Sequence, residues 1–533
     1  MSFTYDLTSE PWIPCLMGAG DMRDLSLTEV LVEAPQVREV LDSSPLVTAS
    51  LHRLLLAIIH RLYGPRDDEV WEEMWLAGRF EEGLIRDYFK QWRHRFDLFD
   101  EERPFYQTPG MPEKMSGAPS LLAQDMAAGN NDTLFDHSAD SSPAVVSASK
   151  AARLLLARQA FSLGGLITAE GGRASAKAAP LAPAAITLLQ GDNLFRTLLL
   201  NLMRYDPGAG DPLPCSDDCP TWEQNATATD EERAPKGYLD YLTWQSRRLF
   251  LQPESDSGGG IVVPKVILAQ GSYFPSNYFP WDTMTPHGVK EKALVGQDPR
   301  PPVRFLAWRA LWRDSLALMQ THSEVAGETL GSRPETLSHL AVLVENGIVS
   351  RREVCGVSVL GLCSKQAKVH FWRHERMSLP LAYLVDDALV GILRTALALA
   401  EDVARALGRA VRSLADAVLS GGEGRRTDQD AVAQLADSLE QPAGYWSSLE
   451  PAFPALLQAL PEADEVGREA ALGDWAGLVE REVWSAWHDA LAGLPDNGRC
   501  LRAIVTAERG LLRSLGLLLK PYKEVKDDEA QSA

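Results

Sequence analysis

The sequence predicts an α+β fold, with a large mixed α/β N-terminal domain over residues 1–380 and a C-terminal four-helix bundle over residues 381–533. Two observations lead to this prediction. Before residue 380, helical apolar spacing gives way to a β-branched, strand-like segment, and Pro- and Gly-rich stretches separate these parts. After residue 380, long apolar stripes are joined by short polar loops, which is typical of antiparallel helices.

The N-terminal domain is expected to begin with helices. Apolar residues recur at helical spacing over residues 45–64, and two more helical stretches follow before residue 96. A further helix is expected over residues 149–161. A strand is predicted within residues 260–271, where isoleucines and valines cluster.

A long mobile loop is expected near residues 117–147. This stretch is rich in Gly, Ala, Ser, Asn and Asp and contains one apolar pair, Leu134 and Phe135. Loops of this length in compact proteins are usually functional or disordered. Phe135 therefore either serves a partner or holds the loop to the body of the protein, and the residues alone leave both readings open.

The C-terminal bundle is predicted from its apolar stripes. Apolar residues step by three and four from Leu389 to Val418, so one long helix is expected to end at Gly421. A helix from residue 428 is broken near two prolines, and another covers about residues 465–494. The last helix is expected to stop at Pro521, with a charged tail that frays from Lys523 onward.

Net charge and hydropathy exclude several classes of protein. The 533 residues carry a formal charge of −21, which excludes a globally basic nucleic-acid binder. No apolar run reaches the roughly 18 residues of a membrane span, and no basic residue precedes Trp12. We therefore expect a soluble cytoplasmic protein without a membrane partner.

The six cysteines are expected to be free thiols in a reducing compartment. Four of them could supply zinc ligands, but the spacing of the second pair does not fit a structural zinc knuckle. No cofactor or metal is predicted, and whether the four bind zinc stays open: Cys215, Cys219, Cys355 and Cys363.

Enzyme signatures are missing from the sequence. We find no phosphate-binding G-x-x-x-x-G-K-[ST], no G-x-S-x-G elbow, no H-E-x-x-H and no dinucleotide fingerprint. His370 and His374 would share one face if residues 368–377 were helical, but only Glu375 lies nearby as a further ligand. Two solvated histidines are the favoured interpretation.

A basic segment over residues 364–377 stands out against the acidic chain. It has a local charge of +3 and includes Phe371 and Trp372. Cations interleaved with aromatic residues are typical of phosphate contact and base stacking. A solvated basic face with two core aromatics is the alternative that composition leaves open.

Short motifs in a fixed order give the chain a specific resemblance. They are Glu10-Pro11-Trp12-Ile13-Pro14, Arg103-Pro104-Phe105-Tyr106-Gln107-Thr108, Pro220-Thr221-Trp222 and Lys365-Gln366-Ala367, followed by the helical C-terminus. In this order they resemble the CasA family, the large subunit of the type I-E CRISPR surveillance complex Cascade. The match extends over most of the chain.

The resemblance implies a subunit that is not an enzyme. In that family it recognises the protospacer-adjacent motif (PAM) of foreign double-stranded DNA, helps open the duplex for guide-RNA pairing, and docks a helicase-nuclease effector. The implied partners are the other Cascade subunits with guide RNA, the target DNA and that effector. A metal-dependent nuclease and a purely structural scaffold remain the alternatives.

The resemblance assigns a PAM glycine loop to Ser162, Leu163, Gly164 and Gly165. Glycine lets the backbone approach the floor of a minor groove only about 6 Å wide. The alternative is that Gly164 and Gly165 cap the helix that ends at residue 161.

The resemblance also implies a wedge at Lys365, Gln366 and Ala367, which parts the first base pair beside the motif. Lys368, Arg373 and Arg376 are expected to contact phosphates and offset the few kcal/mol that unstacking costs. A lysine finger of the family has no clear equivalent, and three candidates remain: Lys265, Gln270 and Ser272. Some relatives carry a C-x-x-C pair in this region, which this chain lacks, so no zinc role transfers.

Phe135, Asp136 and His137 lie where the family has a loop that contacts the 5′ end of the guide RNA and the neighbouring backbone subunit. Phe135 is accordingly expected to stack on a base or to fill a partner's pocket. Because long-range attraction is screened beyond about 8 Å, the local charge at such contacts matters more than the net charge of the chain. We expect weak, salt-sensitive DNA binding by the isolated protein.

Overall fold

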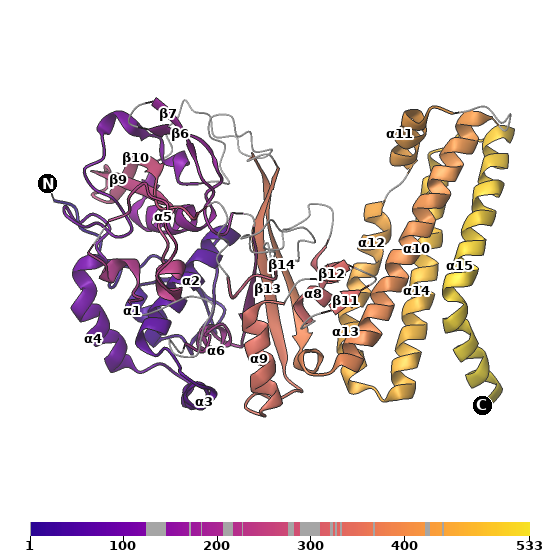
Figure 1. Ribbon diagram of the computed structural model, residues 1–533, viewed down its shortest axis with the longest axis horizontal. Coiled ribbons are helices and arrows are strands. Elements are labelled where there is room, and N and C mark those ends of the chain that lie inside the picture. Colours follow the sequence, from indigo (N-terminus) through magenta and orange to yellow (C-terminus); the bar gives the residue numbers. More distant parts are fainter. Residues whose placement is uncertain are drawn as a thin grey trace. The chain divides into compact units, whose positions relative to one another are not determined.

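A computed structural model describes most of the chain, and every structural statement below concerns its described residues. These are residues 2–123, 145–169, 172–182, 184–205, 217–225, 227–275, 282–287, 310–319, 323–325, 328–330, 333–365, 368–421, 427–439 and 442–532. The chain forms two compact units (Figure 1). Unit 1 comprises Met1–Leu311, Gln320–Ser350 and Cys355–Met377, and unit 2 comprises Trp312–Met319, Arg351–Val354 and Ser378–Ala533.

Unit 1 opens with a three-stranded antiparallel sheet of order β2-β1-β3. Its strands are β1 (Ile13–Met17), β2 (Met22–Leu25) and β3 (Val37–Val40). Between β2 and β3, helix α1 (Leu27–Val32) starts with a capping box, in which Ser26 and Glu29 satisfy each other's backbone N–H groups.

Helix α2 (Pro45–Leu62) is the central helix of unit 1 and is buried over most of its length. Helices α3 (Asp68–Ala77) and α4 (Glu82–Trp92) follow it. Helix α5 (Ala148–Phe161) packs against α2. The sequence prediction of these four helices is confirmed.

A second antiparallel sheet is built around β10 (Ile261–Gln270), which confirms the strand expected within residues 260–271. Strand β10 pairs with β9 (Arg247–Ser255) and with the short strands β4 (Ser116–Gly117) and β5 (Val146–Ser147). Residues 124–144, the centre of the expected loop, lie outside the described residues. A separate hairpin joins β6 (Gly165–Ala169) to β7 (Gly172–Ala176).

The third sheet has the order β14-β13-β8 and contains two long strands. Strands β13 (Val354–Lys365) and β14 (Lys368–Pro380) pair with each other, and β13 also pairs with β8 (Ala185–Gln190). The other elements before the bundle are α6 (Leu194–Leu200), α7 (Tyr238–Leu242), α8 (Leu316–Met319), α9 (Glu335–Glu345), β11 (Ser323–Val325) and β12 (Glu328–Leu330).

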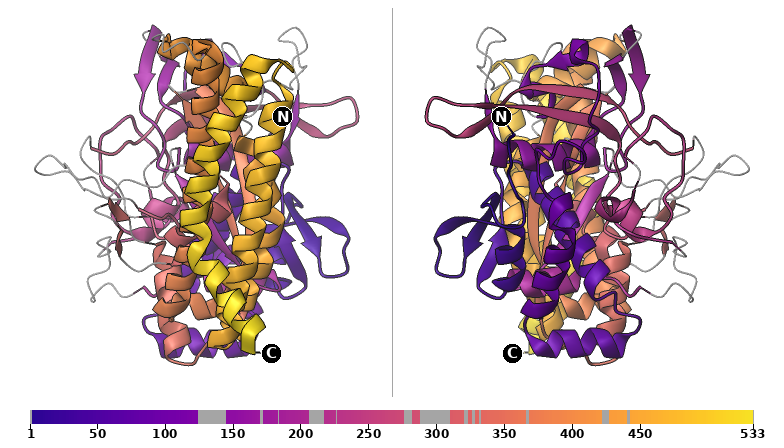
Figure 2. Two further views of the ribbon diagram at one scale, coloured as in Figure 1. Left: turned by 90° about the vertical axis from the view of Figure 1, so that its right-hand side faces the viewer. Right: turned by 90° about the vertical axis from the view of Figure 1, so that its left-hand side faces the viewer.

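Unit 2 is a helical bundle in which α10 (Asp387–Ser420), α14 (Glu465–Ala492) and α15 (Gly498–Ser532) lie side by side (Figures 1 and 2). In place of a fourth long helix, the bundle has three shorter ones: α11 (Gln429–Leu439), α12 (Pro442–Leu449) and α13 (Phe453–Glu462). Buried ring donors join the helices: the Trp475 indole donates to the Ala396 carbonyl at 2.9 Å. The predicted α+β fold with a C-terminal helical region is confirmed.

The two ends of the bundle test the sequence prediction differently. Helix α10 ends where expected, at Gly421, whose φ of 66° suits glycine. Helix α15 continues through Pro521 to Ser532, so the prediction that Pro521 stops it and that the tail frays from Lys523 is wrong. A proline removes only one main-chain hydrogen bond of the helix. Buried Leu515 and Leu519 hold the helix against its neighbours up to Pro521. None of the described helices is long and apolar enough to cross a membrane.

Candidate nucleic-acid interface

The predicted glycine loop, residues 162–165, links the end of α5 to the β6–β7 hairpin. Ser162 is the C-terminal cap residue of α5 and is fully buried. Its hydroxyl donates to the Arg158 carbonyl at 2.6 Å, and its own carbonyl accepts from the Ala179 N–H at 2.7 Å. The loop therefore leaves the helix along a fixed path.

The two glycines serve different geometric needs. A Cβ on Gly164 would lie 3.1 Å from the Ala176 carbonyl oxygen and 3.3 Å from the Ala178 nitrogen, so close backbone approach favours glycine there. Gly165 has a φ of 141° and open space around its Cβ position. Because Gly165 begins β6 rather than ending α5, the interpretation of this pair as a helix cap is not supported.

The buried side chain of Arg247 fixes the glycine loop through hydrogen bonds to main-chain carbonyls. It is 1% exposed and lies at the start of β9. Its Nη2 donates to the Leu163 carbonyl at 2.9 Å and to the Lys177 carbonyl at 2.8 Å, and its Nη1 donates to the Ser246 carbonyl at 2.8 Å. One buried guanidinium thus joins the glycine loop to the residue that follows β7.

Two buried amide side chains complete what we call the Arg247 cluster, namely Gln159, Arg247 and Gln270. The Gln159 side chain accepts from the Arg247 N–H and donates to the Arg247 carbonyl, both at 2.9 Å. The Gln270 side chain accepts from the Lys177 N–H at 2.7 Å and donates to the Ser246 carbonyl at 3.2 Å. Gln270, a candidate for the lysine finger, is therefore occupied with holding backbone.

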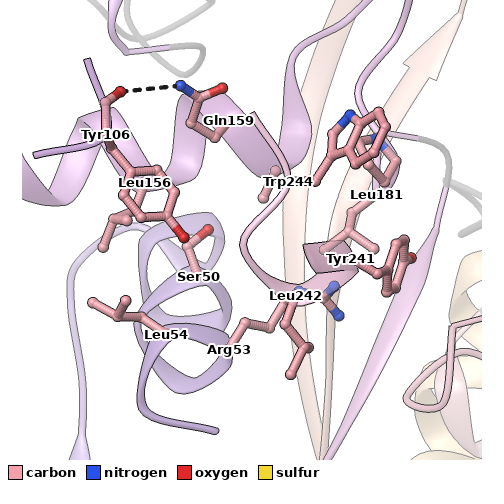
Figure 3. A pocket seen from close by; sticks show the side chains of 12 residues that line it. Ser50, Arg53, Leu54, Tyr106, Leu156, Gln159, Leu181, Tyr241, Leu242 and Trp244 are labelled. Atoms are coloured by element: carbon pink, nitrogen blue, oxygen red, sulfur yellow. Dashed lines mark hydrogen bonds between the residues drawn. The ribbon is translucent and has the colours of Figure 1, made fainter. Parts of the chain in front are cut away.

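The cavity beside this cluster is too small for a ligand larger than water. It holds about 30 Å³ and is lined by Arg53, Tyr106, Gln159, Tyr241 and Trp244, among others (Figure 3). The Gln159 amide points toward the Tyr106 carbonyl, to which it donates at 3.4 Å. We therefore place the candidate site on the surface of the loop.

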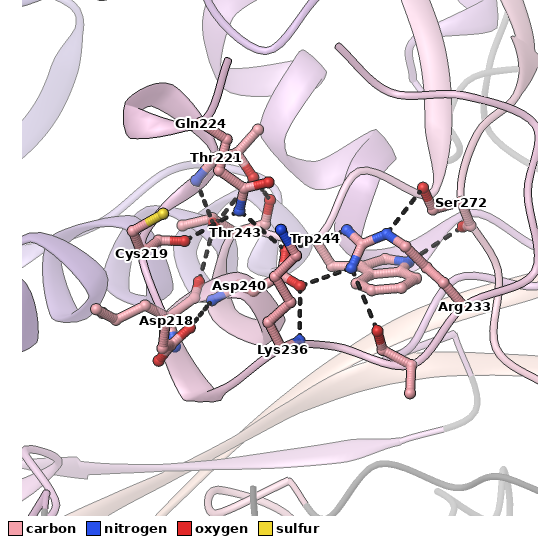
Figure 4. A network of polar contacts seen from close by, with 12 residues as sticks. Asp218, Cys219, Thr221, Gln224, Arg233, Lys236, Asp240, Thr243, Trp244 and Ser272 are labelled. Atoms are coloured by element: carbon pink, nitrogen blue, oxygen red, sulfur yellow. Dashed lines mark hydrogen bonds and ion pairs between the residues drawn. The ribbon is translucent and has the colours of Figure 1, made fainter. Parts of the chain in front are cut away.

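A polar network that includes Ser272, two residues after the end of β10, holds the second lysine-finger candidate (Figure 4). Arg233 stacks on the Trp244 ring at 4.0 Å and forms a bidentate ion pair with Asp240, at 2.6 and 3.1 Å. The buried Ser272 hydroxyl accepts from Arg233 at 3.4 Å, and the Ser272 carbonyl accepts from the Trp244 indole at 3.1 Å. Of the three candidates, Lys265 has the exposed side chain.

The predicted wedge lies between two paired strands. Lys365 ends β13 and Lys368 begins β14, whereas Gln366 and Ala367 lie outside the described residues. Further along β14, Arg373 forms an ion pair with Glu375. Arg376 forms an ion pair with Glu39, which is 337 residues away in the chain. Of the three expected phosphate contacts, Arg373 and Arg376 therefore have carboxylate partners in this structure.

The histidines of this segment lie on a strand rather than a helix. The His374 ring nitrogen lies 3.2 Å from the Ser358 hydroxyl and accepts from Arg376 at 3.1 Å. Burial lowers the pKa of His374, and the charge of Arg376 lowers it further, against the opposing effect of Glu39. A neutral ring that accepts from an arginine has a structural role here.

The comparisons with known proteins agree with this fold. Residues 6–486 match the family model described as CRISPR-associated protein Cse1. The chain belongs to the Cse1 family. A curated relative, the CRISPR-associated protein CasA/Cse1 of Thermus thermophilus, is 33% identical over 524 residues, which cover 96% of this chain and 98% of the relative.

Solved structures share the fold over nearly the whole of this Cse1 chain. Thermobifida fusca Cse1 is 25% identical with a TM-score of 0.82, and the match covers 98% of each chain. A chain of a structure titled "CRISPR RNA-guided surveillance complex" has a TM-score of 0.72 at 20% identity, covering 96% of this chain and 99% of that one, which shows a shared fold.

The N-terminal motifs of this Cse1 protein lie in its core. The Trp12 indole is buried and donates to the Leu7 carbonyl at 3.0 Å. The buried Gln107 side chain donates to the Leu98 carbonyl at 2.7 Å and accepts from the Leu251 N–H at 2.8 Å. These motif residues therefore hold the scaffold together.

Two further expectations for Cse1 fall on residues that the structure covers only in part. Phe135, Asp136 and His137 lie outside the described residues. Cys355 is buried in β13 and Cys219 is half-buried, and both are free thiols. Within the described ranges, no three His, Cys, Asp or Glu side chains are grouped as metal ligands.

Proposed function

We propose that this Cse1 protein is a non-catalytic large subunit of a type I-E CRISPR surveillance complex that recognises the PAM of double-stranded DNA. Its glycine loop enters the minor groove, and the wedge at Gln366 and Ala367 opens the first base pair for guide-RNA pairing. The subunit also docks the helicase-nuclease effector. Residues 381–533 are its bundle domain, and the loop with Phe135, Asp136 and His137 contacts the guide RNA or a neighbouring subunit.

One observation carries this proposal: the conformation of Gly165 on a rigid base. Its φ of 141° and the open space at its Cβ position leave the main chain accessible, while the Arg247 cluster fixes the residues around it. Backbone groups held in place lose little freedom on binding. Main-chain groups can therefore read a narrow minor groove. Contacts in that groove distinguish A·T from G·C pairs better than they distinguish A·T from T·A.

The wedge segment supports strand opening through its charge. Lys365 and Lys368 flank the two wedge residues at the ends of β13 and β14. Arg373 and Arg376 can reach phosphates only by exchanging Glu375 and Glu39 for them, so we assign the first phosphate contacts to the two lysines. The cost of parting one base step is a few kcal/mol, which several phosphate contacts can offset.

The experiment compares duplex targets with targets that are already unpaired beside the PAM, using the assembled surveillance complex. Gly165→Asp and Gln366→Ala should each weaken duplex binding by about tenfold or more, equivalent to about 1.4 kcal/mol. Binding to the pre-opened target should fall less for Gln366→Ala. The matched control is Gly78→Asp, since Gly78 also has a positive φ, 68°, and open space, at the end of α3.

The two alternatives make different predictions in the same experiment. A purely structural scaffold predicts that both variants bind the duplex as the wild type does. A metal-dependent nuclease predicts that the pure subunit cleaves DNA with magnesium or manganese, which we do not expect. Either result would refute the proposal.

A further inference from the structure

The β6–β7 hairpin carries two exposed cations whose side chains have no partner among the described residues. Arg173 lies on β7, and Lys177 follows directly after that strand. No ion pair or side-chain hydrogen bond of either residue occurs there. By contrast, Arg373 and Arg376 of the wedge region already pair with carboxylates. The hairpin therefore presents charge that the folded protein does not use itself.

Lys177 is held beside the glycine loop. Its N–H donates to the Gln270 side chain at 2.7 Å, and its carbonyl accepts from Arg247 at 2.8 Å. The Cβ position of Gly164 lies 3.7 Å from the Lys177 carbonyl carbon. The backbone from which this ammonium projects is thus fixed at the same base as the loop.

The spacing of the two cations fits the backbone of a duplex. Arg173 and Lys177 are four residues apart along extended chain, which is about 13 Å at roughly 3.3 Å per residue. Phosphates along one strand of B-DNA advance by about 3.4 Å of helix axis each. Two side chains at this separation can therefore contact different phosphates of the same duplex.

The same face of the hairpin also exposes an apolar side chain. Leu166 is 71% exposed and pairs across the hairpin with Ser175, two residues from Arg173 on the same face. An exposed leucine between cations is unfavourable in water unless a partner covers it. Sugar edges beside a minor groove provide such a cover.

We propose that Arg173 and Lys177 form a phosphate-binding surface for duplex DNA, adjacent to the minor groove that the glycine loop enters. This inference rests on the proposed function of the loop. Lysine and arginine contacts to phosphates position a protein on the duplex without reading sequence. The surface therefore sets affinity and register, while the loop reads the motif.

The test is the salt dependence of duplex binding by the assembled complex. Each lost phosphate contact should make the slope of log K against log salt shallower by about 0.9. Between about 50 and 200 mM salt, Lys177→Ala should thus lose about 3.5-fold less affinity than the wild type, equally for every PAM sequence. Arg173→Ala should behave alike, and Lys177→Arg should restore the wild-type slope.

The control is Lys90→Ala, which removes an exposed lysine from α4, at the end of unit 1 opposite the hairpin (Figure 1). Unchanged slopes for both hairpin variants would overturn the inference. A loss confined to one PAM with an unchanged slope would also overturn it, since that result means base reading. If Gly165→Asp binds normally while Lys177→Ala loses its contact, the proposed role of the loop fails and the phosphate surface stands.

Discussion

Replacing Arg247 with methionine tests whether the buried cluster under the glycine loop positions it. Methionine keeps most of the apolar volume and removes three hydrogen bonds, to Ser246, Leu163 and Lys177. Hydrogen bonds from a charged donor are worth about 1.5–3 kcal/mol each, so roughly 5–9 kcal/mol is lost. Relief from burying the cation returns several kcal/mol.

The direction of the pKa shift of Arg247 agrees with a cost of burying this cation. Burial and, to a smaller extent, the nearby charge of Arg158 lower the pKa of Arg247 to about 9. The guanidinium still carries its charge at neutral pH, but it does so at a cost. We therefore expect a net loss of about 2–4 kcal/mol in the free energy of unfolding of the subunit.

Two measurements separate lost stability from a displaced loop. Urea unfolding of the subunit gives the first, and amide hydrogen exchange over residues 163–179 gives the second. In the assembled complex, Arg247→Met should weaken duplex binding more than binding to a pre-opened target. Arg247→Lys, which keeps the charge and part of the bonding, should recover some duplex affinity.

The matched control is Arg95→Met. Arg95 also donates to two backbone carbonyls of unit 1, those of Trp222 at 2.8 Å and Gln224 at 2.5 Å. This variant should lose stability and keep its preference for duplex over pre-opened DNA. If Arg247→Met unfolds at the wild-type urea concentration, or if both variants alter duplex binding equally, our account of the cluster is wrong.

Two further predictions concern the interior of unit 1. Arg53 and Asp282 form a buried ion pair at 2.7 Å, so Arg53→Met should cost about 3–5 kcal/mol in urea unfolding, and adding Asp282→Leu should recover part of that loss. Burial lowers the pKa of His52 to about 4 and that of His60 to about 3. Since both rings titrate near pH 6.5 when unfolded, the unfolded chain binds more protons in acid, and stability should fall by about 3 kcal/mol between pH 6.5 and pH 5. If the free energy of unfolding does not change between pH 6.5 and pH 5, the assignment of the two histidines is wrong. If Arg53→Met unfolds with the wild-type free energy, the assignment of the ion pair is wrong.

The helices could be predicted from the sequence because their signals are local. The stripe from Leu389 to Val418 and the glycine at 421 define α10, whose bounds need no distant contact. Pro521 misled the prediction for a related reason. A local breaker signal was outweighed by buried leucines packed against other helices, and those contacts cannot be read from spacing.

The candidate site was predicted only in part because its support comes from far along the chain. Gly164 and Gly165 could be identified from the resemblance, but Arg247 lies 84 residues from the Leu163 carbonyl that it holds. The ion pair of Arg376 with Glu39 likewise joins distant segments, so composition overstated the free charge of the basic segment. The spacing of cations within the hairpin was the one signal that would have pointed to Lys177.

The bonds that hold the glycine loop have an evolutionary consequence. The side chains of Arg247 and Gln270 bind main-chain atoms of Leu163 and Lys177. The side chains of Leu163 and Lys177 take no part in these bonds. A lineage under pressure from changing invaders can therefore exchange the side chains at 163 and 177 while the loop keeps its position. The affinity of the complex for DNA can drift in this way without loss of the geometry that reads the motif.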